Sequence, residues 1–215
     1  QATQQLVRTN TNLGAVLLLA PLAAVPRNIP LGTGIRDVLS GLSAGDARRV
    51  YEAIRLACPG GLGHVPRMDV ADLPPQSLRE AMQEAAERDL VARQYVNDFE
   101  QVLLGVAPQI LAGVACGWTL CESIVFAQLQ TLAVFPDSLI ARKCGAEIAR
   151  SASARASRVL ESGRPGETSY ARALSDFDFW LRSDQHRRNP GTTADLIAAG
   201  LFVLLRDGLM ATPFR

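Results

Sequence analysis

The strongest constraint on the fold of this chain is a series of helix-start signals with no strand pattern between them. Ser43 followed by Asp46, and Ser77 followed by Glu80, are capping boxes, in which two side chains satisfy the first free N–H groups of a helix. Apolar residues follow each box at helical spacing, and no segment of useful length alternates with a period of two. The sequence therefore predicts an all-α protein.

Further apolar segments continue this pattern along the chain. Pro108 suits the first turn of a helix, and Gly163 suits the end of one. The expected helices cover residues 13–25, 43–57, 77–104, 108–117, 118–132, 137–161, 168–181 and 196–205.

Composition fits helices packed around one core. The chain has 215 residues, of which 48% are hydrophobic and 6% aromatic. Ala and Leu dominate, which suits packed helices better than sheets. A chain of this length buries one sizeable core, so we expect residues 1–215 to form a single compact multi-helix domain. The formal charge of +1 gives no basic surface for nucleic acid.

The apolar segment 13–25 resembles the core of a signal peptide, but polar residues precede it and Pro21 interrupts it. It is also shorter than the stretch of about 20 residues that crosses a bilayer. We interpret it as a buried helix and find no other membrane candidate. The cysteines form no C-x-x-C pair and are interpreted as reduced core residues. They are Cys58, Cys116, Cys121 and Cys144.

The segment NPGTTADL at 189–196 is typical of a phosphate-binding helix start. Thr192 is placed to cap the helix, with Asp195 as the return partner of a capping box. Gly191 lets the backbone approach a ligand, and Arg188 adds positive charge just upstream. The free N–H groups and the dipole of a helix N-terminus favour an anion. The alternative is an ordinary capped helix.

Two further segments accompany this one: NTNLG at 10–14 and PDSLIARK at 136–143. In this order and separation, NTNLG, DSLIARK and NPGTTADL resemble three motifs of the triphosphoribosyl-dephospho-CoA synthase family. Members of that family show N-T-H-K-G, D-[ST]-L-I-A-R-K-x-G and N-P-G-[ST]-[ST]-A-D-L. The first and last motifs lie far apart, so the resemblance covers nearly the whole chain. It implies an all-helical, cytoplasmic enzyme that joins ATP to 3′-dephospho-CoA, releases adenine and leaves a triphosphoribosyl group on the coenzyme's ribose.

The chain also departs from the family pattern. Asn12 and Leu13 stand where the family has His and Lys. The K-P-G segment that usually precedes the first motif is absent, and the sequence opens at Gln1, so we expect residues 1–215 to be the C-terminal part of a longer polypeptide. The segment 61–70 resembles a divergent branch found in methanogens and one-carbon-using bacteria. That branch leaves open an acceptor other than dephospho-CoA.

A polar stripe marks the expected helix 77–104. Asp89 and Arg93 continue a face that begins with apolar residues, which indicates a partly buried polar site. The alternative is a helix that exposes Asp89 and Arg93 as a solvated pair one turn apart. Displacing adenine builds positive charge on the ribose, which a carboxylate stabilises, and a carboxylate also accepts the proton of an attacking hydroxyl. We predict that Asp89, with Arg93 beside it, takes these catalytic roles.

A polyphosphate substrate needs several N–H donors and cations, and a carboxylate-held Mg²⁺ usually helps. Asp89 or Asp137 is the predicted Mg²⁺ ligand. We expect Asn10, Asp89, Asp137, Arg142 and Asn189 to converge on one cleft. The predicted nucleotide-binding residues are Asn10, Thr11, Asn12, Gly14, Asp137, Ser138, Arg142, Lys143, Arg188, Asn189, Gly191, Thr192 and Thr193.

Three functions remain open on the sequence. The first is a triphosphoribosyl transferase that uses ATP, as the resemblance implies. The second is another phosphate-substrate enzyme of the same fold in the biosynthesis of a coenzyme, such as a one-carbon carrier. The third is a non-catalytic helical binding or assembly protein. The expected partners are small nucleotide or coenzyme substrates, without nucleic acid or membrane, and a homodimer is left open.

Overall fold

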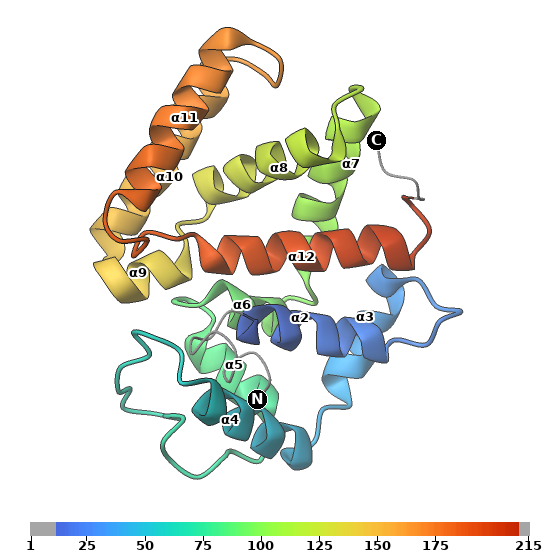
Figure 1. Cartoon of the computed structure of the whole chain (residues 1–215). Coiled ribbons are helices and arrows are strands. Elements are labelled where there is room, and N and C mark those ends of the chain that lie inside the picture. The colour runs from blue at the N-terminus through green and yellow to red at the C-terminus, as the bar shows by residue number, and fades with distance from the viewer. Residues whose placement is uncertain (1–11, 211–215) are drawn as a thin grey trace. The chain divides into compact units, whose positions relative to one another are not determined.

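The computed structural model describes residues 12–210, which form eleven α-helices and one short π-helix, with no strand in that range (Figure 1). The all-α prediction is confirmed. These residues make two compact units that divide after Glu100. We call them unit 1 and unit 2 and describe each by itself. The expectation of a single domain stays a prediction.

The described part of unit 1, residues 12–100, has five helices. They are α2 (Leu13–Ala24), α3 (Leu31–Ser40), α4 (Ala44–Ala57), α5 (Leu78–Ala85) and α6 (Leu90–Val96). Leu18 and Leu22 of α2 are fully buried, as are Leu31 and Ile35 of α3, and each such side chain stabilises the fold by about 1.5–3 kcal/mol. The prediction that the apolar segment 13–25 is a buried helix is therefore confirmed.

The capping box at the start of α4 is confirmed, because Ser43 accepts from the Asp46 N–H while the Asp46 carboxylate accepts from the Ser43 N–H. The loop that follows α4 is held by that helix. The Arg55 guanidinium donates to the carbonyls of Val70 at 2.6 Å and Asp72 at 2.5 Å. This long Gly- and Pro-rich segment therefore has defined anchors.

The predicted single helix over 77–104 is wrong. It begins at Ser77 as expected, but α5 ends at Ala85 and Asp89 starts a new helix. The Asp89 carboxylate accepts from the N–H groups of Val91 and Ala92, and an Asp that bonds its own following backbone competes with helix continuation. The polar stripe expected along one continuous helix therefore does not form.

Unit 1 ends in a second break, at Asp98 and Phe99. Both have positive φ, 56° and 63°, a conformation that costs free energy for a residue with a Cβ. The Phe99 ring is fully buried and lies 6.0 Å from the Tyr95 ring, while the Tyr95 hydroxyl donates to the Leu17 carbonyl at 2.6 Å. Burial of these two rings holds the turn in place.

Unit 2 begins with the π-helix η1 (Gln101–Val106), and its described residues, up to 210, contain six α-helices. They are α7 (Ala107–Ala115), α8 (Leu120–Val134), α9 (Ser138–Cys144), α10 (Ala146–Glu161), α11 (Thr168–Arg182) and α12 (Gly191–Arg206). The predicted proline in the first turn of α7 is confirmed. The predicted helix over 137–161 is wrong, because Gly145 adopts a φ of 93° and separates α9 from α10.

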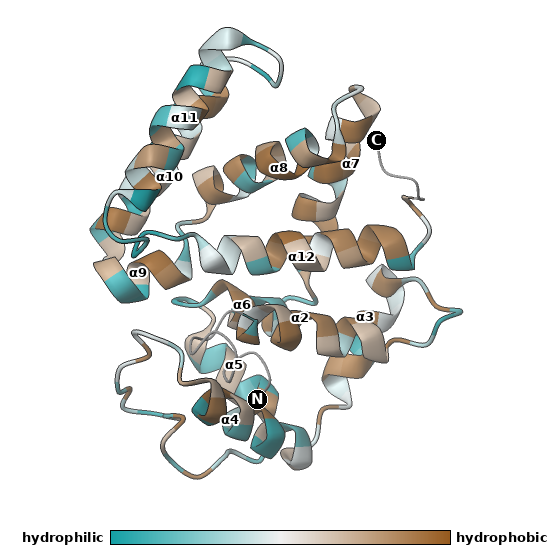
Figure 2. Cartoon of the chain, in the orientation of Figure 1, coloured by the Kyte–Doolittle hydropathy of each residue, from teal (hydrophilic) through white to brown (hydrophobic). Residues whose placement is uncertain are grey.

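The helices of unit 2 approach one another closely at two glycines. A Cβ at Gly113 of α7 would lie 2.8 Å from the Ser123 Cβ of α8, and a Cβ at Gly200 of α12 would lie 2.5 Å from a Val106 methyl group. Figure 2 shows that α12 is apolar along most of its length, whereas α10 and α11 carry more hydrophilic residues. The close approaches therefore bury α12 and α8 at the centre of unit 2.

No single helix within residues 12–210 is long and apolar enough to span a membrane, although α8 and α9 together meet that test by length and composition, with a bend of 60° between them. The four cysteines are free, as predicted. The expectation that they are core residues is wrong for three of them, because Cys58, Cys116 and Cys121 are exposed.

Candidate functional site

One buried carboxylate joins two of the three sequence motifs. Asp137 is fully buried at the start of α9. Its Oδ1 accepts from the N–H groups of Leu139 at 2.9 Å and Ile140 at 3.0 Å. Its Oδ2 accepts from the Thr193 N–H at 2.7 Å and from the Thr193 hydroxyl at 2.8 Å. A single side chain thus caps α9 and holds the first turn of α12.

Two effects act in opposite directions on the pKa of Asp137. Burial is the larger effect and raises the pKa of Asp137 above its ordinary value, although the hydrogen bonds from Thr193, Ile140 and Leu139 act in the opposite direction. Four donors point at its two oxygens. The acceptor at the start of α12 is therefore a side chain of the protein itself.

The predicted Thr192–Asp195 capping box is wrong. Helix α12 begins at Gly191, earlier than the expected start at Leu196, and its first turn has no cap from the preceding residue. Thr192 is buried, with 3% of its surface exposed. Asp137 supplies from α9 the oxygen that Thr192 was expected to supply, and both Thr193 donors are used in that bond.

The packing of α12 against α9 requires a glycine at position 191. A Cβ at this position would lie 2.6 Å from a methyl group of Leu139, so the absence of a side chain lets the start of α12 lie against α9. The Gly191 N–H donates to the Asn189 carbonyl at 2.8 Å. The Asn189 residue itself is exposed.

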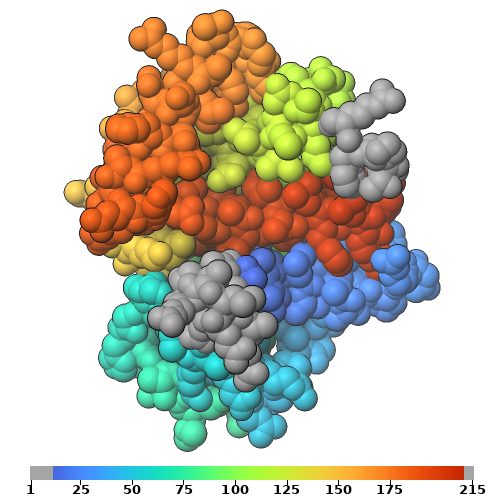
Figure 3. Space-filling view, viewed as in Figure 1, coloured from blue at the N-terminus to red at the C-terminus, as the bar shows by residue number. Residues whose placement is uncertain are grey.

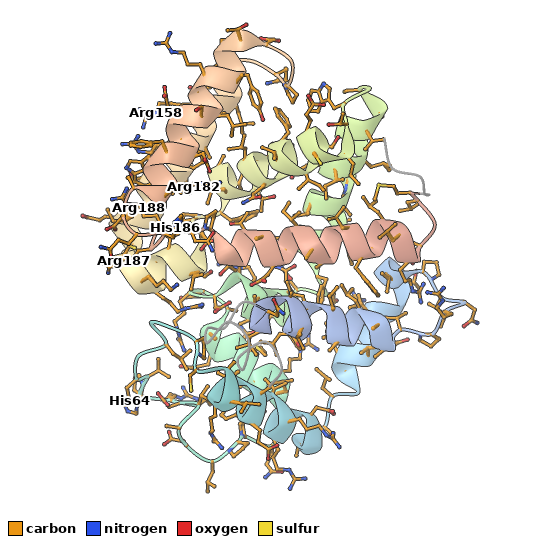
Figure 4. The ribbon with its side chains drawn as sticks, viewed as in Figure 1. His64, Arg158, Arg182, His186, Arg187 and Arg188 are labelled. Carbon is orange, nitrogen blue, oxygen red and sulfur yellow. The ribbon has the colours of Figure 1, made fainter. Side chains whose placement is uncertain are left out.

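A basic loop connects α11 to α12 (Figure 4). Arg188 donates to the Trp180 carbonyl at 2.7 Å, and its guanidinium lies 4.5 Å from the centre of the Trp180 ring. Arg155 of α10 lies at the same distance from that ring. The Arg187 guanidinium donates to the Lys143 carbonyl at 2.9 Å. These contacts fix the loop against α9, α10 and α11.

The same loop closes one end of a cavity between α8 and α11. Figure 3 shows the orange surface of α11, behind which most of α8 is hidden. The cavity has a volume of about 660 Å³, within the range of small-molecule sites. Its lining combines apolar residues of both helices with polar residues near the loop. The lining residues are Val125, Gln128, Leu129, Leu132, Ala171, Leu174, Ser175, Phe177, Asp178, Leu181, Arg182, His186, Asn189 and Pro190.

The other predicted residues of the second motif lie on α9. Ser138 is its buried first residue, while Arg142 is half-buried and Lys143 exposed in its last turn. Cations there are favourable for the helix dipole. In unit 2, Asp137 contacts the start of α12 and Lys143 lies beside the basic loop, whereas the convergence of Asp137, Arg142 and Asn189 on one cleft stays a prediction.

The remaining predicted residues belong to unit 1. Asn12 is exposed and precedes α2 without a side-chain cap, and Gly14 lies in the first turn of that helix. Asn10 and Thr11 lie outside the described residues. The convergence of these residues, and of Asp89, with those of unit 2 stays a prediction.

Asp89 and Arg93 hold the corner between α5 and α6. Asp89 is the N-cap of α6. The Arg93 guanidinium donates to the carbonyls of Ala86 at 3.1 Å and Glu87 at 3.5 Å, which are the free carbonyls at the end of α5. Both side chains therefore have a structural role, and a catalytic role for them stays a prediction.

The described residues contain no group of three or more His, Cys, Asp or Glu side chains that could hold a metal ion. Asp137 does not fit the role predicted for it, because protein donors occupy both of its oxygens.

The chain matches one known protein family over nearly its whole length. A model of the family described as ATP:dephospho-CoA triphosphoribosyl transferase matches residues 1–213. The chain belongs to this family. Members of the ATP:dephospho-CoA triphosphoribosyl transferase family are nucleotide-dependent transferases, so the predicted enzyme class is confirmed, and the other two functions left open on the sequence are not favoured.

A solved structure agrees with the family. The chain is similar to a protein of Archaeoglobus fulgidus assigned as a triphosphoribosyl-dephospho-CoA synthase, with 27% sequence identity and a TM-score of 0.70. The similarity covers 92% of this chain and 83% of the archaeal one. A comparison with proteins of curated function gives no match.

Sequence reasoning missed two features of the site in this transferase. The motifs located Asp137 and Thr193, but not the bond between them, because pairing across 56 positions is set by tertiary packing. The cavity was missed because its apolar residues have the ordinary spacing of core positions on α8 and α11. The only feature of the sequence that could have indicated the cavity is the presence of Arg182 and His186 shortly before the third motif.

Proposed function

We propose that this protein transfers the triphosphoribosyl group of ATP to 3′-dephospho-CoA and releases adenine. The observation that carries the proposal is the bond between Asp137 and Thr193. It joins the two motifs of unit 2 that resemble the family, and it fixes the start of α12 beside a loop rich in cations. The family match over residues 1–213 supplies the reaction.

The reaction breaks the bond between C1′ of the ATP ribose and adenine, and forms a bond from C1′ to a ribose hydroxyl of the acceptor. The hydroxyl proton passes to a general base, and the departing adenine nitrogen takes up a proton, so charge and atoms balance. Positive charge develops on the ribose, and a carboxylate near C1′ stabilises it.

We propose distinct roles for the residues of unit 2. Asn189, Lys143 and Arg142 contact the phosphates, since they flank the fixed start of α12. Arg188 holds the loop on Trp180 and contributes charge. Asp137, Ser138, Gly191, Thr192 and Thr193 act as the buried frame of the site, because their donors, acceptors or packing serve the junction of α9 and α12.

We propose roles in unit 1 for Asn10, Thr11, Asn12 and Gly14, as contacts to the nucleotide, and for Asp89, as the carboxylate that acts near C1′. Arg93 positions Asp89 by holding the α5–α6 corner. We propose that Mg²⁺ enters with the triphosphate of ATP, with Asp89 as the protein carboxylate available to it.

The substrates are intermediates of coenzyme biosynthesis, and we therefore propose a cytoplasmic location. We also propose a homodimer, which light scattering of the purified chain checks directly. Neither proposal affects the reaction.

The decisive experiment incubates the protein with ATP, Mg²⁺ and 3′-dephospho-CoA and measures adenine by chromatography. We expect adenine and a product heavier by the triphosphoribosyl group, in equal amounts. Asn189→Ala should lower the rate, whereas Arg150→Ala, which removes an exposed cation from α10, should not. Formation of phosphate or pyrophosphate without adenine would show that the protein catalyses another reaction.

A further inference from the structure

We propose that the cavity between α8 and α11 binds the pantetheine arm of the acceptor, with the acceptor's diphosphate at the end lined by Arg182 and His186. This inference rests on the proposed function, and it assigns a substrate part to a site that the motifs do not cover, except at Asn189 and Pro190.

The cavity is elongated. Its lining extends over residues 125–132 of α8 and 171–182 of α11, which correspond to about 10 Å and about 16 Å of helix at 1.5 Å per residue. Pantetheine has about twelve bonds along its chain from the hydroxyl oxygen to the sulfur, as many as four peptide residues, and spans roughly 14 Å when extended. A purine ring is much shorter and would leave most of this length unfilled.

The walls suit the chemistry of that arm. Leu129, Leu132 and Phe177 form an apolar floor and are each at most 5% exposed, which suits the methyl and methylene groups of pantetheine. Gln128 is half-buried in the wall and Ser175 lies on the rim. Their side chains are hydrogen-bond partners of the type that the two amides of pantetheine need.

The charged residues gather near one end. Arg182 and His186 line the cavity where α11 ends (Figure 4). Arg182 donates to Asp178 at 2.8 Å, but its side chain keeps 65% of its surface exposed, so the guanidinium is accessible to an anion. A diphosphate is the anionic part of dephospho-CoA next to pantetheine, and Arg is well suited to bind it.

The order of chemical groups along dephospho-CoA then matches the order of residues from the cavity to the start of α12. With pantetheine between α8 and α11 and the diphosphate at Arg182, the adenosine of the acceptor lies beyond His186, towards Asn189 and the start of α12. The reacting hydroxyl is on that adenosine's ribose. This arrangement brings the reacting hydroxyl to the motif residues, while the pantetheine arm stays between α8 and α11.

The test uses a substitution that narrows the cavity from its rim. Ser175→Phe places a ring in the cavity at an exposed position, so folding is preserved, and Ser169→Phe is the matched control on the same helix outside the lining. Binding of dephospho-CoA, 4′-phosphopantetheine and ATP to the full chain is measured by calorimetry. Ser175→Phe should weaken dephospho-CoA binding about tenfold or more, equivalent to roughly two lost methylene contacts.

The same variant should weaken 4′-phosphopantetheine equally and leave ATP binding unchanged, and Ser169→Phe should change none of the three. A selective loss of ATP binding would show that the cavity holds the nucleotide donor and would overturn the inference. Unchanged binding of dephospho-CoA would also overturn it. Because adenine release by the wild-type protein is a separate readout, these results are distinguishable from a failure of the proposed function.

Discussion

Replacing Asp137 with Asn puts an NH₂ group where an oxygen now accepts two hydrogen bonds. At least one pair of buried donors loses its acceptor, and a buried donor without a partner costs about 1–3 kcal/mol. We expect Asp137→Asn to lower the free energy of unfolding by about 3 kcal/mol or more, measured by urea titration. Thr193→Ser keeps the hydroxyl and serves as the control. An unchanged urea midpoint for Asp137→Asn would mean that the junction of α9 and α12 does not depend on this carboxylate.

Asp89 allows its capping and catalytic roles to be separated. Asn caps a helix as well as Asp, so Asp89→Asn should keep stability, whereas Asp89→Ala should cost about 1 kcal/mol. If Asp89 acts at the reacting centre, Asp89→Asn lowers kcat by about a hundredfold or more, the usual contribution of a general base. Full activity of Asp89→Asn would leave this residue as a helix cap only.

Glu122 links stability to acid pH. The Thr119 hydroxyl and N–H donate to its carboxylate and hold the pKa of Glu122 below the ordinary value of 4.5. Since the folded pKa is the lower one, its contribution is present above pH 4.5 and is lost as pH falls through the folded pKa. We expect Glu122→Gln, which keeps an acceptor for the cap, to reduce the decrease in Tm between about pH 5 and pH 3. A variant whose Tm falls as steeply as that of the wild type would contradict this assignment.

At the scale of elements, the contact between α7 and α8 depends on Gly113. A methyl group there would meet the Ser123 backbone at 3.1 Å as well as its side chain. Overpacking costs about 1–3 kcal/mol, which exceeds the gain of about 1 kcal/mol for replacing Gly by Ala in a helix. Gly113→Ala should therefore destabilise the protein in urea titration. The control is Gly105→Ala, which meets nothing within 4 Å and should be neutral or stabilising.

Sequence reasoning predicted where helices begin more reliably than where they stop. The caps at Ser43 and Ser77 are local, and both begin helices as predicted, although the reciprocal half of the box is present only at Ser43. The breaks at Asp89 and Gly145 were missed because a capping Asp and a glycine are also tolerated inside helices, and only tertiary packing decides between the two outcomes. Thr192 failed for the same reason, since its expected role is filled by Asp137 from another helix.

At the scale of the whole molecule, the family and the helical fold followed from three short motifs and from helix periodicity. The arrangement of the site within unit 2 did not, because it depends on Asp137 and Thr193, which meet across α9 and α12. The cavity between α8 and α11 likewise arises from how two helices pack, and each helix alone has only an ordinary apolar face.

Ligand binding should stabilise the folded chain by mass action. A ligand at a hundred times its Kd contributes about 2.7 kcal/mol, which corresponds to a rise in Tm of about 5–10 °C for a protein of this size. We expect ATP with Mg²⁺ and dephospho-CoA each to raise Tm, and their effects to add, because donor and acceptor must be bound together for transfer. Asn189→Ala should reduce the shift caused by ATP, while Arg150→Ala should preserve it. If the two ligands together raised Tm no more than the more effective one alone, they would compete for one site, and a direct transfer between them would be excluded.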